Sequence, residues 1–125
     1  MNNQKTFAIL GATQNREKYG WKITNNLKKR KLNVIPINPK YEYIEGLKCY
    51  KNVDSITSKI DYLIVVIPPS NALLALKDIR TADIGTVWFQ PGAESEENID
   101  YCKNRGWHII SGECIMINTP SSYKK

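Results

Sequence analysis

The segment best suited to ligand binding is residues 11–20, which opens with Gly11 directly after an apolar stretch. Glycine permits a tight turn and lets a bound group approach the backbone closely. If a helix follows, its first N–H groups and the positive end of its dipole attract a phosphate, and Lys18 adds positive charge. A lone glycine fits a plain turn equally well, so this segment gains meaning only together with other loops.

The residues that follow the second apolar stretch, 38–40, bear on which nucleotide the chain would take. A dinucleotide-binding Gly-x-Gly-x-x-Gly motif starting at Gly11 needs glycine where the chain has Thr13 and Arg16. The acidic residue that holds the ribose of NAD is also missing, and Lys40 stands in this segment. A lysine here favours a ligand with an extra phosphate, such as NADP or a 3′-phosphorylated adenosine, over NAD.

The side chains capable of catalysis do not form a set. His108, the sole histidine, falls in a predicted strand beside Trp107, where a packed or edge histidine is expected rather than a general base. Cys114 is a candidate nucleophile or partner for a thiol, although structural cysteines are common. Nothing pairs Glu94 with Glu113 as acid and base. The sequence predicts no catalytic residue and leans towards a protein without chemistry of its own.

Composition indicates one globular domain over residues 1–125, with 42% hydrophobic and 24% charged residues. The chain has three cysteines without Cys-x-x-Cys spacing and a single histidine, so we expect reduced thiols and no metal site. It shows no signal peptide pattern and no apolar run approaching the roughly 20 residues of a membrane span. We therefore expect a cytoplasmic protein that does not contact a membrane.

The net charge of +6 favours an anionic partner. The one dense basic run, residues 28–31, lies at the end of a predicted helix, where cations complement the helix dipole. A solvated helix end therefore explains this run better than a nucleic-acid surface. The sequence does not identify a protein partner.

The apolar pattern predicts alternating strands and helices. Five strands are expected, at Thr6–Leu10, Asn33–Ile37, Tyr62–Ile67, Thr86–Phe89 and Trp107–Ile110. Helical spacing is found at residues 19–27, 72–79 and 95–106, with a weaker turn at 54–58 and a long loop over 38–50. This alternation predicts a doubly wound, Rossmann-like parallel sheet, α/β in class, in the order 3-2-1-4-5.

In such a sheet, ligands bind beyond the carboxyl ends of the strands, where the strand order reverses. Two further loops reach that edge. The first contains Pro68 and Pro69, which make a rigid border poor in N–H groups, although a plain helix start explains them too. The second contains Gln90 and Gly92. Each loop alone is a weak signal, and together they surround one crevice.

The loops resemble the small stand-alone coenzyme A-binding proteins and, more distantly, the nucleotide-binding domain of the succinyl-CoA synthetase α subunit. The resemblance covers nearly the whole chain and depends on the order and spacing of six segments. These segments read AILGAT (8–13), VIPINPK (34–40), IEGLKCY (44–50), IPP (67–69), WFQPG (88–92) and GECIM (112–116).

The resemblance implies that the chain binds coenzyme A, free or acylated, through its adenosine and phosphates. The residues it implicates are Gly11, Ala12, Thr13, Lys18, Asn38, Pro39, Lys40, Ile67, Pro68, Gln90 and Gly92. By this likeness the first loop receives phosphates, residues 38–40 lie beside the adenosine, and Lys40 lies near the 3′-phosphate or ribose. The loop at residues 67–68 would line the adenine, and the loop at 90–92 would border the exit towards pantetheine.

Other functions remain open. One is an NADP-binding reductase, or a nucleotide-binding subunit of a larger enzyme, although the chain leaves little room for a substrate pocket and proton donor. Another is a regulatory or interaction module that uses the basic surface, which salt-sensitive DNA binding would support.

Overall fold

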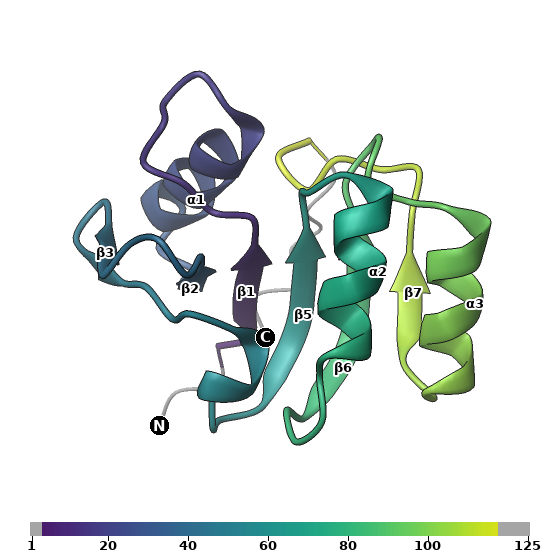
Figure 1. The fold of residues 1–125 in the computed structure, drawn as a ribbon. Coiled ribbons are helices and arrows are strands. Elements are labelled where there is room, and N and C mark those ends of the chain that lie inside the picture. The colour runs from purple at the N-terminus through teal and green to yellow at the C-terminus, as the bar shows by residue number, and fades with distance from the viewer. Residues whose placement is uncertain (1–3, 118–125) are drawn as a thin grey trace.

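Five parallel strands form the central sheet of this computed structural model, which describes residues 4–117. The strands are β1 (Thr6–Leu10), β2 (Asn33–Ile37), β5 (Ile60–Val65), β6 (Ile84–Phe89) and β7 (His108–Ile110). They lie in the order β2-β1-β5-β6-β7 (Figure 1). Every residue of β1 is buried, as expected of a parallel strand covered on both faces. The predicted doubly wound α/β class is confirmed.

The observed strand order is consistent with the predicted Rossmann-like pattern 3-2-1-4-5. Strand β5 pairs with β1 and β6 in the middle of the sheet. Residues 63–65 are 0% exposed, and only a central strand buries such an apolar run so fully. The place outside β2 is taken by Tyr50, which forms a single parallel bridge to Ile37. If the segment at Tyr50 is counted as the third strand, β5 and β6 become the fourth and fifth strands, and the order follows the Rossmann-like pattern.

Three helices cover the two faces of the sheet. Helix α1 (Tyr19–Lys29) packs through Ile23 and Leu27 into the core on one face. Helices α2 (Pro69–Lys77) and α3 (Glu96–Asn104) belong to the core on the other face, which is turned towards the viewer in Figure 1. None of the helices in residues 4–117 combines the length and the hydropathy that crossing a membrane requires.

Both ends of α3 follow the predicted capping pattern. The Ser95 side chain accepts a hydrogen bond of 3.0 Å from the Asn98 N–H, and Glu96 and Glu97 occupy the first turn. Gly106 follows the helix with φ of 82°, the left-handed conformation that ends many helices. The chain can then turn directly into β7.

The segment between β2 and β5 is more ordered than the predicted loop over residues 38–50. It contains a small antiparallel hairpin of β3 (Tyr43–Ile44) and β4 (Leu47–Lys48). Glu45 and Gly46 at its tip have φ of 51° and 79°, and positive φ at both central residues is typical of a two-residue type I′ turn. The weak helical turn predicted at 54–58 is a 3₁₀ turn, η1, at Val53–Ser55.

The start of α1 lies directly against the beginning of the loop that leaves β1. A Cβ atom placed on Gly20 would stand 2.0 Å from the Gly11 carbonyl oxygen, far closer than van der Waals contact. Gly11 itself has φ of 110° and packs against the side chains of Val66 and Ile67. These two glycines therefore fix the path of residues 11–20, and Gly11 serves packing as well as the turn.

We expect Gly20→Ala to destabilise the protein by about 1–3 kcal/mol, because the added methyl group must displace the backbone of Gly11. At an ordinary helical glycine the same substitution has the opposite effect, because alanine stabilises a helix by about 0.5–1 kcal/mol relative to glycine. Urea unfolding followed by tryptophan fluorescence measures the change. Gly85→Ala in β6 is the matched control, because its added Cβ would lie 3.1 Å from the Asp61 carbonyl and meets less overlap. A Gly20→Ala variant more stable than the parent would contradict the packing described.

Candidate functional site

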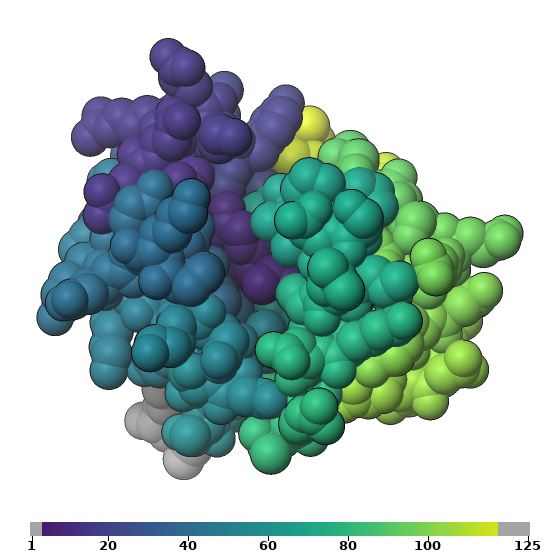
Figure 2. All heavy atoms as spheres, viewed as in Figure 1, coloured from purple at the N-terminus to yellow at the C-terminus, as the bar shows by residue number. Residues whose placement is uncertain are grey.

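A cleft of about 290 Å³, called here the first cleft, begins at the carboxyl ends of β1 and β2 and runs along α2. Figure 2 shows it as a hollow between the blue segment that follows β2 and the teal helix α2, with purple residues of the β1 end at its floor. The lining residues are Leu10, Gly11, Ile37, Asn38, Pro39, Lys51, Asn52, Val53, Asp54, Ile67, Asn71, Ala75, Asp78 and Ile79.

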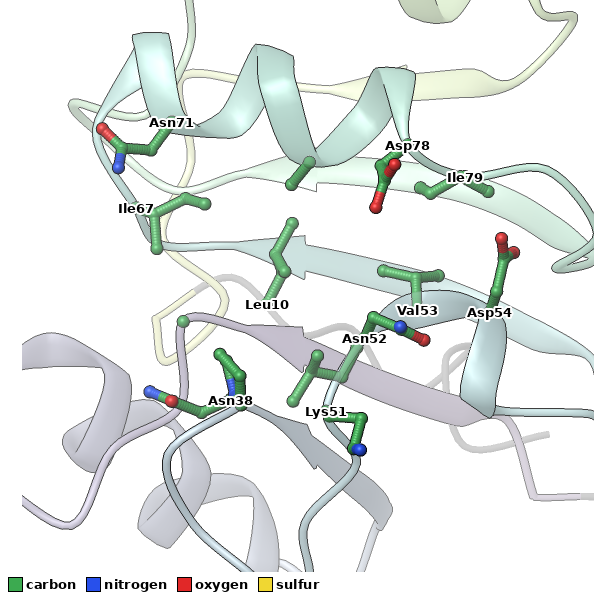
Figure 3. A pocket seen from close by; sticks show the side chains of 14 residues that line it. Leu10, Asn38, Lys51, Asn52, Val53, Asp54, Ile67, Asn71, Asp78 and Ile79 are labelled. Carbon is green, nitrogen blue, oxygen red and sulfur yellow. The ribbon is translucent and has the colours of Figure 1, made fainter.

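Asn38 ties the loop after β2 to the loop after β1. Its Nδ2 donates to the Ala12 carbonyl oxygen at 2.8 Å, and its Oδ1 accepts from the Lys40 N–H at 2.8 Å. The carboxyl ends of two neighbouring strands are thus joined through one side chain. Asn38 and Ile67 lie at the same end of the first cleft, where the strands end (Figure 3).

The β3–β4 hairpin segment holds the loop of residues 11–20 from the side. Tyr41 and Thr13 share a hydrogen bond of 3.2 Å between their hydroxyl oxygens, and Gln14 Nε2 donates to the Tyr43 carbonyl oxygen at 2.8 Å. Trp21 Nε1 donates to Glu45 Oε2 at 2.8 Å. The loop is therefore positioned by a segment about 30 residues away along the chain, as the separation of 28 residues between Thr13 and Tyr41 illustrates.

The two ends of the first cleft differ in chemistry. Asn38 and Asn71 stand near the strand ends, and the carboxylates of Asp54 and Asp78 stand at the far end (Figure 3). The Asp54 carboxylate accepts hydrogen bonds from the N–H groups of residues 80, 81 and 82 at 2.9–3.0 Å. Burial raises its pKa, these hydrogen bonds lower it more, and the net pKa lies below the usual value. Asp54 is committed to that turn, which leaves Asp78 as the carboxylate able to meet a ligand.

Positive charge lies along one edge of the first cleft. Pro39 and Lys51 line both this cleft and a shallow neighbouring hollow, which also contains Lys40 and Lys48. All three lysines are exposed. A group bound in the first cleft can therefore place an anion against this edge while its uncharged part remains in the cleft.

A second cleft, of about 570 Å³, lies on the other side of Ile67, which lines both. It is bounded by the start of α1 and by the loops after β5, β6 and β7. Its lining is mostly apolar and includes Pro68, Gln90 and Gly92. The carboxyl edge of the sheet thus carries two adjoining clefts of different character.

The structure brings eight of the eleven predicted ligand residues into these hollows. Gly11, Asn38, Pro39 and Ile67 line the first cleft, Ile67 with Pro68, Gln90 and Gly92 lines the second, and Lys40 lines the shallow hollow. The other three, Ala12, Thr13 and Lys18, lie in the loop and line none of these three hollows. Ala12 and Thr13 are buried, and Lys18 precedes α1 without capping it through its side chain.

Sequence reasoning missed the lining residues contributed by η1 and α2. Lys51 and Asn52 precede η1, and Asn71 and Asp78 lie at the two ends of α2. The available signal was Asn52, whose Oδ1 accepts from the Ser55 N–H at 2.8 Å and is typical of a helix N-cap. Asp78 carried no local signal, because it reaches the cleft only through the packing of α2 on the sheet.

The candidate catalytic residues lie apart or are engaged elsewhere. His108 is exposed on the edge strand β7, as predicted. Glu94 Oε1 accepts from the Gly92 N–H at 2.9 Å. Burial raises the pKa of the Cys102 thiol to about 11 and also raises that of Cys49, so neither is a ready thiolate. In residues 4–117, no three His, Cys, Asp or Glu side chains are grouped to hold a metal ion.

A doubly wound parallel sheet with a cleft where its strand order reverses defines a nucleotide-binding domain of Rossmann-like type. A family model described as a CoA binding domain matches residues 5–120. The chain therefore belongs to the CoA-binding domain family.

Known proteins place this family relation in context. The chain is 44% identical over 121 residues to an ADP-forming acetate–CoA ligase of Methanocaldococcus jannaschii, which covers 90% of the chain but only 17% of the ligase. A conserved hypothetical protein of Pyrococcus furiosus superposes with a TM-score of 0.85 and 39% identity, covering 93% of this chain and 99% of that one. Dinucleotide-forming acetyl-coenzyme A synthetase 1 of Ca. Korarchaeum cryptofilum was solved with phosphate and ADP. It superposes with a TM-score of 0.75 and 27% identity, covering 86% of this chain and 25% of the synthetase.

We expect Asn38→Asp to destabilise the protein by about 1–3 kcal/mol, because a carboxylate cannot donate to the Ala12 carbonyl oxygen. Asn52→Asp is the matched control. Asn52 Oδ1 only accepts at the start of η1, so a carboxylate preserves its role and stability should hardly change. Urea unfolding of both variants at neutral pH gives the comparison. Equal effects of the two substitutions would show that the Asn38 bridge does not hold the loops together.

Proposed function

We propose that this chain binds coenzyme A, free or acylated, through its adenosine and phosphates, and that it catalyses no reaction by itself. The observation that carries this proposal is the position of the first cleft in a chain of the CoA-binding family. The cleft begins at the carboxyl ends of β1 and β2, at the edge where Rossmann-like sheets receive nucleotides.

The first cleft suits the adenosine. Leu10, Ile37 and Ile67 give it an apolar floor for a base, while Asn38 and Asn71 offer amide groups at the end nearest the strand termini. The carboxylate of Asp78 is able to accept hydrogen bonds from hydroxyl or amino groups. A phosphate is a poor occupant of the far end, because two carboxylates stand there.

Two features that border the clefts suit the phosphates, the start of α1, where Tyr19 lines the second cleft, and the lysines near Pro39 beside the first cleft. Helix α1 begins at Tyr19 with no acidic residue in its first turn and no side-chain cap, which leaves its positive end available to an anion. Lys40 and Lys51 line the shallow hollow together with Pro39 and are able to pair with a phosphate of the ribose. This arrangement supports a ligand with a phosphorylated adenosine and a diphosphate.

The groups nearest to reactive chemistry support the proposed lack of catalysis. Glu94 accepts from the Gly92 N–H, and burial raises the pKa of the Cys102 thiol to about 11, so this thiol stays protonated at neutral pH.

Calorimetric titration of the reduced chain at fixed salt tests the proposal, with coenzyme A, dephospho-coenzyme A, NAD and NADP as ligands. We expect saturable binding that favours coenzyme A. Lys40→Ala should weaken coenzyme A binding by about threefold to tenfold, equivalent to ~0.7–1.4 kcal/mol, and should leave dephospho-coenzyme A unchanged. Lys51→Ala tests the neighbouring lysine in the same way, and Lys103→Ala on α3 is the control, because it lies outside all three hollows. Binding of NADP without binding of coenzyme A would overturn the proposal and favour the reductase.

A second candidate function is the CoA-binding part of a larger ADP-forming ligase. The 44% identity to one portion of such a ligase favours it. Recovery of the tagged chain from its own cells in a stable complex with ADP-forming ligase activity would support this role. A chain recovered alone, still able to bind coenzyme A, would support the stand-alone role.

A further inference from the structure

The second cleft has an uncharged, mostly apolar lining, unlike the edge of the first cleft, where we propose that phosphates bind. Among its described lining residues there is no charged side chain, and most contribute only apolar atoms. Its mouth carries Tyr19 and Ile117, which are 65% and 80% exposed. The volume of about 570 Å³ is twice the 290 Å³ of the first cleft. Such a cavity suits an apolar group and rejects a phosphate.

One buried polar atom in the wall of this cleft has no partner. Gln90 is 4% exposed, and its Oε1 accepts from the Ile115 N–H at 3.0 Å. Its Nε2 has no hydrogen-bond partner among residues 4–117. A buried donor without an acceptor is costly, so the site favours a ligand that brings an acceptor to this point. A carbonyl oxygen is the simplest such acceptor on an otherwise apolar group.

The position of the second cleft connects it to the nucleotide site. Ile67 lines both clefts, and both open at the carboxyl edge of the sheet. A ligand whose adenosine occupies the first cleft therefore reaches the second cleft with its other end. An acyl thioester combines the two features that the lining requires, an apolar chain and a carbonyl oxygen.

We propose that the second cleft binds the acyl chain of an acyl-coenzyme A, with Gln90 Nε2 donating to the thioester carbonyl. This rests on the proposed coenzyme A binding and names the form of the ligand. The chain then discriminates between loaded and free coenzyme A. The ligand class is a thioester with an apolar acyl group of several carbons.

Titration of the full chain with coenzyme A, acetyl-coenzyme A and hexanoyl-coenzyme A tests the acyl preference. We expect hexanoyl-coenzyme A to bind at least about tenfold more tightly than coenzyme A, because its additional methylene groups leave water. S-hexyl-coenzyme A, a thioether without the carbonyl, should bind about threefold to tenfold more weakly than hexanoyl-coenzyme A. Equal affinities for coenzyme A and hexanoyl-coenzyme A would overturn the acyl proposal and leave coenzyme A binding intact.

Two variants separate the roles of the cleft and of Gln90. Cys114→Phe adds bulk to a half-buried position of the lining and should bring hexanoyl-coenzyme A down to the affinity of coenzyme A. Leu74→Phe adds bulk at a 71% exposed position on α2 and should change neither affinity. Gln90→Glu retains the acceptor for the Ile115 N–H and removes the donor, so the difference between hexanoyl- and S-hexyl-coenzyme A should disappear.

The outcomes distinguish failure of this inference from failure of the proposed function. Absence of binding to every coenzyme A ligand would overturn both. Binding of coenzyme A with no response to chain length or to Cys114→Phe would overturn the acyl proposal alone. A dimer in light scattering that dissociates in Cys114→Phe, with no dependence on acyl length, would assign the cleft to a second copy of the chain and also overturn the acyl proposal.

Discussion

Helix α1 starts against the backbone of the loop that precedes it, and the rest of the carboxyl edge is arranged around this contact. Gly20 leaves no room for a Cβ atom beside the Gly11 carbonyl oxygen, where that atom would lie only 2.0 Å away. Gly11 in turn packs against Val66 and Ile67 at the end of β5. The contact therefore joins β1, α1 and β5 at one point and determines where the two clefts open.

Hydrogen bonds from distant segments complete the edge. Asn38 joins the loop after β2 to Ala12, and Tyr41 joins the hairpin segment to Thr13. The Thr13 hydroxyl oxygen also accepts from the Asn15 N–H, so this side chain helps to shape the loop. Ile67 separates a nucleotide cleft with polar ends from an apolar cleft, which gives one edge two kinds of binding surface.

The sequence was informative where structure follows from local pattern. The apolar runs located the five strands to within two or three residues, and Ser95 with Gly106 marked both ends of α3. The hairpin was missed because its strands have two residues each and are stabilised by packing of Ile44 against the α1 side of the core. Both Glu45 and Gly46 have positive φ in the turn of this hairpin. In the sequence, only Gly46 indicated such a turn.

The lining residues that follow strands could be predicted from the sequence, whereas those contributed by α2 and by the segment before η1 could not. Gly11, Asn38, Pro39 and Ile67 follow strands, and the ends of parallel strands meet at one edge, so their convergence could be foreseen. Asp78 and Lys51 enter the first cleft through the docking of α2 and the path of the chain before η1.

Amide NMR of the labelled chain during titration with coenzyme A tests the central claim most directly, because it reports both binding and position. The account predicts saturable shifts with one common affinity at the amides of Gly11, Asn38 and Ile67, which border the first cleft. Shifts confined to the basic residues 28–31, or no shifts at all, would contradict a coenzyme A site at this edge of the sheet.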